Sequence, residues 1–210
     1  MIKIITDYGG MLFSALGQTL IMALCSLLFA CMIGLIFGIL SVLKNKPCNA
    51  VYRIFVDVVR GVPMAINNMF PTAHFTLTAL QAGIVCLSLN CGAYMAEIIR
   101  AGIQSVDIGQ MEACRSLGMT YGQAMRKVVL PQAIKTMIPS IINQFIITLK
   151  DTSILSVIGF PELVNTTKNV ISVSMDSFGG WACAGIMYLV VITILSYIAK
   201  FIERRMNRGR

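Results

Sequence analysis

The segment 107–131 reads DIGQMEACRSLGMTYGQAMRKVVLP and is the longest amphipathic, charge-bearing stretch in an otherwise apolar chain. Asp107 is placed to cap a first helix, and Gln110 three residues later is able to return a hydrogen bond to that cap. Gly118 fits the position just after this helix, where the backbone commonly turns left-handed. The first half of the segment therefore predicts a short capped helix that ends in a glycine turn.

The second half of the segment predicts another short helix. Thr120 is a good capping residue and again has a partner three residues later, Gln123. Pro131 does not continue a helix in the ordinary way, so we expect it to end this one. Two short helices and a glycine turn, flanked by long apolar runs, would form a rigid knob that projects from a membrane.

The rest of the chain has the composition of a membrane protein. Of its 210 residues, 57% are hydrophobic and 12% are charged, against about 25% charged in soluble domains. Four apolar runs are long enough to span a bilayer as helices, and these are 11–43, 75–96, 137–160 and 181–199. The predicted fold class is an all-α polytopic membrane bundle, a single domain over 1–210 that contains a cytoplasmic loop at 97–135.

The basic residues predict a topology and argue against a nucleic-acid partner. The net charge of +8 is gathered in short segments beside the apolar runs, at 44–60, at 97–135 and from residue 200 onward. Segments of this kind stay in the cytoplasm, so we expect a cytoplasmic C-terminus. If 44–60 and 97–135 are both cytoplasmic, the chain crosses the membrane an even number of times between them, yet only 75–96 is an evident span.

The stretch 51–74 is therefore the weak point of the predicted topology. Three charged residues lie among its apolar ones, and each costs roughly 2.5–3.5 kcal/mol at mid-bilayer on insertion scales. Residues 61–75 add two prolines and two asparagines. We expect a helix over 51–62 to dip at most into the interface, and we expect the isolated chain either to insert poorly or to hold 61–75 as a re-entrant turn shielded by partner protein.

Gly34 and Gly38 form a GxxxG pair in the first apolar run. This spacing favours a close contact with another helix. An equally good interpretation is that glycine is simply common in membrane helices.

Polar residues inside the apolar runs are candidates for a transport pathway. The sequence Lys150-Asp151-Thr152-Ser153 interrupts the third run, and charges there need a partner or a wet cavity. Two interpretations stay open: Asp151 faces a cavity and receives an amino group, or these charges snorkel or pair with another span.

Asn90 and Glu97 lie seven residues apart and so share one face of their predicted helix. That face is a candidate lining of the same pathway, although Glu97 is equally able to pair with Arg100 or Arg115. The candidate pathway residues are Asn90, Glu97, Asp151, Thr152 and Ser153.

No pattern in the sequence predicts catalysis or metal binding. The seven cysteines are scattered, odd in number and without a CxxC pair, so neither a disulfide framework nor a metal site is expected. A Walker A loop and a Ser–His–Asp set are also missing from the sequence. We therefore expect a chain that is not an enzyme and carries no cofactor of its own.

The central segment resembles the EAA loop of ABC importer permeases. Glu112-Ala113-Cys114, then Gly118, then Val128-x-Leu130-Pro131 follow that pattern at its fixed spacing, and the flanks resemble the polar amino-acid uptake branch over nearly the whole chain. Cys114 stands where alanine is usual, Val128 where isoleucine is common, and Asp107 where proline is common. The residues that this resemblance assigns to coupling are Glu112, Ala113, Gly118, Val128, Leu130 and Pro131.

This resemblance implies a type I importer permease subunit with five spans in a bacterial inner membrane, importing a polar amino acid such as glutamine. It implies that the knob docks on a separate ATP-binding subunit, which holds the ATP and Mg, and that a solute-binding protein and a second permease subunit, identical or not, complete the transporter. Two alternatives are a gradient-driven small transporter or channel and a non-transporting truncated remnant. A gradient-driven carrier needs no docking knob, and the sequence shows no evident inverted repeat.

The sequence departs from this family after Arg60-Gly61-Val62-Pro63. Relatives carry a long apolar segment there that completes the second span. Here that segment is largely missing, and we expect about 15–25 residues to be absent on the length that a span needs.

Overall fold

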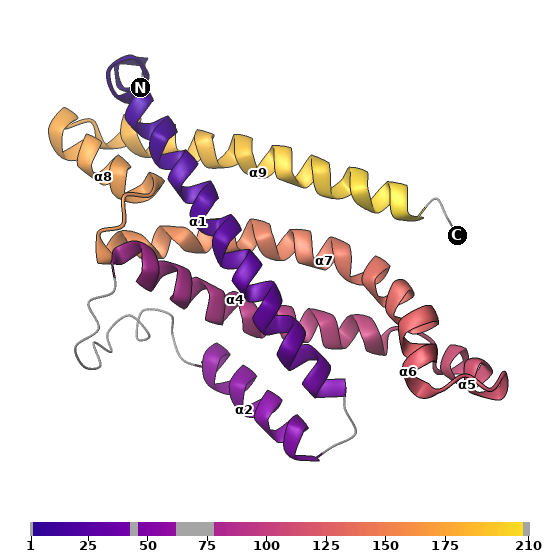
Figure 1. Cartoon of the computed structure of the whole chain (residues 1–210). Helices are drawn as coiled ribbons and strands as arrows, with labels where there is room; N and C mark the ends of the chain where they lie inside the picture. Colours follow the sequence, from indigo (N-terminus) through magenta and orange to yellow (C-terminus); the bar gives the residue numbers. More distant parts are fainter. Residues whose placement is uncertain (1, 43–45, 62–77, 208–210) are drawn as a thin grey trace.

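A computed structural model describes residues 2–42, 46–61 and 78–207 (Figure 1). All regular structure in these residues is helical. The elements in chain order are α1 (Ile2–Val42), α2 (Lys46–Gly61), α4 (Ala79–Gln104), α5 (Ile108–Ser116), α6 (Tyr121–Ala124), the π-helical η1 (Met125–Val129), α7 (Leu130–Asp151), the 3₁₀-helical η2 (Thr152–Ile158), α8 (Leu163–Ser174) and α9 (Ser177–Asn207).

Four of the described helical stretches are long and apolar enough to cross a membrane. They are Lys3–Val42, Ala79–Gln104, Tyr121–Ile158 and Ser177–Arg205. The two short helices α5 and α6 project together from one end of this bundle (Figure 1). The predicted all-α polytopic fold class is confirmed.

The contact between α1 and α4 is the most extensive one in the described bundle. Gly34 and Gly38 of α1 lie directly against Met95 and Ile99 of α4, and a Cβ added at Gly38 would be 2.8 Å from Ile99 Cγ2. Only glycine lets the two helices approach this closely, so the interpretation of this GxxxG pair as a helix contact is confirmed.

α1 and α4 also run in the same direction. Met22 lies against Gly83 near the start of α4, whereas Gly38 lies against Ile99 near its end. Two parallel helices require the chain to return between them. The structure thus agrees with the even number of crossings that the basic loops demanded.

α2 begins before the helix that we expected over 51–62, at Lys46, and it ends at Gly61. It runs in the returning direction, antiparallel to α1 (Figure 1). The re-entrant turn expected over 61–75 lies outside the described residues, apart from Gly61.

The packing of α2 makes it part of the bundle. Tyr52 and Val56 are buried together with Ala96 of α4, and Phe37 of α1 stacks on Phe55 with ring centroids 3.9 Å apart. These residues recur at three- and four-residue spacing, which is one face of a helix. α2 therefore gains its place from contacts with two long helices.

The expectation that Pro131 ends a helix was wrong. α6, η1 and α7 follow one another without a break, and Pro131 lies in the first turn of α7. The π-helical turn before it bonds the Leu130 amide to the Met125 carbonyl, five residues back. This wider turn accommodates the proline ring, which would otherwise press on the carbonyl four residues before it.

Candidate functional site

The knob is held by its own local hydrogen bonds. Asp107 Oδ1 accepts from the Gly109 amide at 2.6 Å, so Asp107 caps α5 as predicted, although its side-chain bond goes to Gly109 and the return bond expected from Gln110 is not formed. Gly118 follows α5 with φ of +80°, which confirms the predicted left-handed turn. Thr120 then caps α6.

The cap of α6 is the reciprocal pair that the sequence predicted. The Gln123 amide donates to Thr120 Oγ1 at 3.3 Å, and the Thr120 amide donates to Gln123 Oε1 at 3.0 Å. Arg115 closes the turn between the helices by donating from Nη1 to the Met119 carbonyl at 3.0 Å. The two caps and the turn of the knob are therefore formed by hydrogen bonds within 107–131 itself.

The surface of the knob exposes large apolar side chains. Leu117 is 82% exposed, Ile108 74% and Tyr121 50%, whereas Cys114 and Ala124 are buried inside the knob. Exposed apolar groups on a rigid projection are typical of a protein interaction site. The knob is therefore the strongest candidate docking surface among the described residues.

The six predicted coupling residues divide into two groups in the structure. Glu112, Ala113, Gly118 and Pro131 are exposed, whereas Val128 and Leu130 are half-buried. The exposed members are available to a partner. The half-buried members lie at the junction of η1 and α7, where they join the knob to the long helix.

A second polar region lies between α4 and α7. The Thr148 hydroxyl donates to the Gln144 carbonyl at 2.9 Å and its oxygen lies 3.3 Å from Cys91 Sγ, and all three residues are buried. Asp151 is half-buried at the end of α7. Asn90 precedes Cys91 and is also half-buried. Asn90 and Asp151 therefore belong to the two helices that meet in this region, α4 and α7, and whether they face one pathway remains a prediction.

Gln144 and Thr148 in this region were not among the residues predicted from the sequence. A usable signal was present, because Gln144, Thr148 and Asp151 recur at four- and three-residue spacing and so share one face of α7. Thr152 is fully buried with its hydroxyl donated to the Leu149 carbonyl at 2.7 Å, and the adjacent Ser153 is half-buried. Thr152 and Ser153 begin the 3₁₀ turn η2 directly after Asp151.

The carboxylate of Glu97 is engaged away from the region of Asp151. It forms an ion pair with Arg60 of α2, which is neither of the two arginines considered from the sequence, Arg100 and Arg115. The guanidinium of Arg60 also lies over the Tyr94 ring, 4.7 Å from its centroid. The interaction was missed because its partner lies 37 residues earlier in the chain.

A buried carboxylate that the sequence did not single out lies between η2 and α8. Glu162 is fully buried and accepts from the Asn165 amide at 2.6 Å, the Val164 amide at 2.8 Å and the Tyr188 hydroxyl at 3.4 Å. Burial raises the pKa of Glu162, and the two amide bonds oppose that shift. Glu162 therefore caps α8 and ties it to α9.

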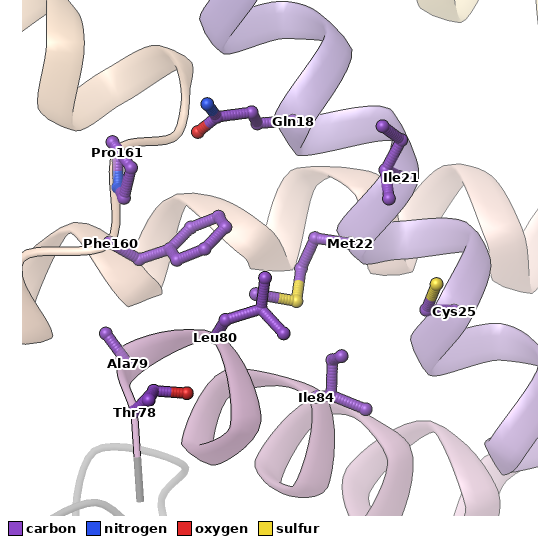
Figure 2. A pocket seen from close by; sticks show the side chains of 10 residues that line it. All are labelled: Gln18, Ile21, Met22, Cys25, Thr78, Ala79, Leu80, Ile84, Phe160 and Pro161. Carbon is purple, nitrogen blue, oxygen red and sulfur yellow. The ribbon is translucent and has the colours of Figure 1, made fainter.

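A cavity of about 550 Å³ opens where α1, the start of α4 and the turn before α8 meet (Figure 2). Phe160, Met22 and Leu80 extend into it, while Gln18 and Thr78 supply polar groups (Figure 2). None of the five candidate pathway residues lines this cavity. Its apolar wall does not suit a charged or strongly polar ligand.

Comparison with known proteins places these features in a family. The family described as "Binding-protein-dependent transport system inner membrane component" matches residues 30–208. The probable amino-acid permease protein YxeN of Bacillus subtilis is 37% identical over 206 residues, covering 94% of this chain and 92% of the relative. The solved structure of an amino acid ABC transporter with histidines is 36% identical with a TM-score of 0.91, covering 96% of both chains.

A further relative corrects the expected deletion. The probable glutamine ABC transporter permease protein GlnM of Bacillus subtilis is 34% identical over 213 aligned residues that cover 99% of both chains. The two lengths therefore differ by only a few residues. The expectation that about 15–25 residues of the second span are missing was therefore wrong when the chain is compared with this permease.

Proposed function

Since the chain belongs to the family of binding-protein-dependent transport system inner membrane components, we propose that it is the permease subunit of an ATP-driven importer for a polar amino acid. The observation that carries the proposal is the family match over residues 30–208, which includes the whole knob. The names of the relatives support an amino acid as substrate, and that of GlnM supports glutamine.

The knob is the proposed site of coupling to ATP hydrolysis. Its exposed Leu117, Ile108 and Tyr121 offer apolar area to a groove on an ATP-binding subunit, and Glu112 offers an exposed carboxylate beside them. Because the caps and the Gly118 turn make the knob rigid, a displacement of the partner would reach α4 and α7 without being absorbed by the turn. ATP and Mg belong to that partner, and this chain supplies no catalytic group.

The interface between α4 and α7 is the proposed substrate pathway. Asn90 and Asp151 supply an amide and a carboxylate, which suit the polar and ammonium groups of an amino acid. Thr152 and Ser153 begin the turn that ends this wall. Glu97 has its carboxylate engaged by Arg60, so it is not available to a substrate in this structure.

The proposed assembly contains two permease subunits, identical or homologous, with ATP-binding subunits on the cytoplasmic side and a solute-binding protein outside. The basic residues that end α9, Arg204 and Arg205, support a cytoplasmic C-terminus. The whole chain acts as one membrane domain, and 97–135 is its cytoplasmic coupling loop.

Reconstitution tests this proposal directly. The chain is purified with an ATP-binding subunit and a solute-binding protein from the same organism and placed in liposomes, and uptake of labelled glutamine is measured with other polar amino acids as competitors. We expect uptake to need internal ATP and the binding protein and to persist when ion gradients are collapsed. Uptake that follows an ion gradient without ATP would favour a gradient-driven carrier, and a stable complex that imports no amino acid would favour a remnant.

A substitution at Asp151 tests the pathway. Asp151→Asn should lower uptake about tenfold, since a neutral amide attracts a substrate ammonium less well, and it should leave membrane abundance unchanged. Asp57→Asn, on the exposed face of α2, is the matched control and should transport normally. Equal loss of uptake and abundance in Asp151→Asn would assign Asp151 a structural role instead.

A further inference from the structure

α2 carries charges that do not suit a helix packed among long apolar helices. Arg53 and Asp57 lie on its exposed face, while Arg60 lies in its last turn, about 37% exposed and directed at α4. A guanidinium next to an apolar bundle needs a counter-charge or a polar contact, because removing it from water is costly. The position of α2 therefore depends on how Arg60 is neutralised.

α4 provides this neutralisation with two side chains. Glu97 forms the ion pair with Arg60, and Tyr94, one turn earlier, lies under the guanidinium with its centroid 4.7 Å away. An arginine held by both a carboxylate and an aromatic face is fixed in position as well as in charge. Both partners belong to the helix that leads directly into the knob.

The other contacts between α2 and α4 involve residues on the same face of α2 as Arg60. Arg100 of α4 is 5.5 Å from the centroid of the Tyr52 ring, and Val56 is buried against Ala96. Tyr52, Val56 and Arg60 are spaced four residues apart, so they form one stripe along α2. The apolar and cation–π contacts of this stripe bury surface between α2 and α4. The ion pair at its end fixes how far α2 is shifted along α4.

We propose that Arg60 and Glu97 form a latch that positions α2 against α4, and that Glu97 acts in this latch and not as a substrate contact. The latch sits two turns before the end of α4, so it braces the helix from which the knob continues. Its role follows from contacts within this chain and does not rest on the identity of the transported substrate.

The test uses the burial of Val56 as the reporter of α2 placement. Val56→Cys is introduced into the full chain after its native cysteines have been replaced, and the rate of maleimide labelling is measured in detergent. Val56 is 4% exposed, so labelling should be slow while α2 stays on α4. We expect Glu97→Gln, and separately Arg60→Glu, to raise this rate about fivefold, a modest change because the pair is partly exposed.

The charge swap separates the latch from a general loss of structure. The double variant Arg60→Glu with Glu97→Arg restores opposite charges in reversed order, and it should return the labelling rate to within about twofold of the parent. Val58→Cys is the matched control, because Val58 is 56% exposed on the outer face of α2 and should label at one rate in every variant.

The melting temperature of the otherwise native chain gives a second measure that needs no label. Each single variant should lower it, and the swap should recover most of the loss. Single variants with unchanged labelling and unchanged melting temperature would overturn the proposal. A swap no better than the single variants in both measurements would overturn it as well.

Discussion

The knob at 107–131 and the contact between α2 and α4 both rely on charged and polar side chains, but over very different distances along the chain. In the knob, Thr120 bonds to Gln123 and Arg115 bonds to Met119, so each partner lies within one helical turn. In the other region, Arg60 reaches Glu97 across 37 residues. Local hydrogen bonds give the knob its shape, whereas α2 takes its place from its packing against α4 and α1.

We expect the largest effect from a substitution that disrupts the turn of the knob and leaves the rest of the chain intact. Gly118→Val places a β-branched residue at φ of +80°, where strain of about 1–3 kcal/mol opposes the turn, and the amount of ATP-binding subunit that co-purifies should fall more than about tenfold. Gly122→Val is the matched control, since Gly122 has ordinary φ and open space around it. Normal co-purification with Gly118→Val would show that docking does not need this turn.

A surface change on the knob should have the next largest effect. Leu117 is 82% exposed and contributes little to the fold, so Leu117→Asp should weaken binding of the ATP-binding subunit about fivefold and leave the melting temperature unchanged. Val173→Asp on α8 alters a residue of similar exposure, 71%, and should not affect that binding. Titration of the two purified variants with the subunit measures the difference, and equal affinities would remove Leu117 from the docking surface.

The buried carboxylate of Glu162 predicts that the stability of the protein depends on pH. Its pKa in the folded chain is raised from the ordinary value of 4.5, so the stability that its protonated form contributes is complete below that value and is lost as the pH rises through the raised pKa. The melting temperature in detergent should therefore decline over this window, and Glu162→Gln should remove that part of the decline. Glu203→Gln, on the exposed end of α9, should leave the decline intact.

The smallest expected effect concerns the apolar part of the α2 contact. Phe55→Leu removes a ring that stacks on Phe37 at 3.9 Å, and it should lower stability by about 0.5–1.5 kcal/mol beyond the loss of buried area. Ile54→Leu, at a position that is 63% exposed, should change stability very little. A loss that is as large for Ile54→Leu would mean that the outer face of α2 is also covered in the purified protein.

The sequence by itself determined the helical membrane class, the capping residues and left-handed turn of the knob, and the need for an even number of crossings. Each of these rests on hydrophobic run length, charge position or interactions within a few residues, which the order of residues states directly. Even here Pro131 was misjudged, because a π-helical turn of the backbone accommodated it without ending the helix.

The tertiary structure alone decided which charges meet and which polar groups are buried together. From the sequence, Arg100 and Arg115 were the candidate partners of Glu97, but the packing of α2 on α4 places Arg60 against its carboxylate. In the same way Cys91 meets Thr148, and Glu162 meets Tyr188, only once α7 and α9 are placed. Such pairs depend on how whole helices are placed relative to one another. That placement results from all the packing contacts between the helices, and the spacing of residues within one segment does not reveal it.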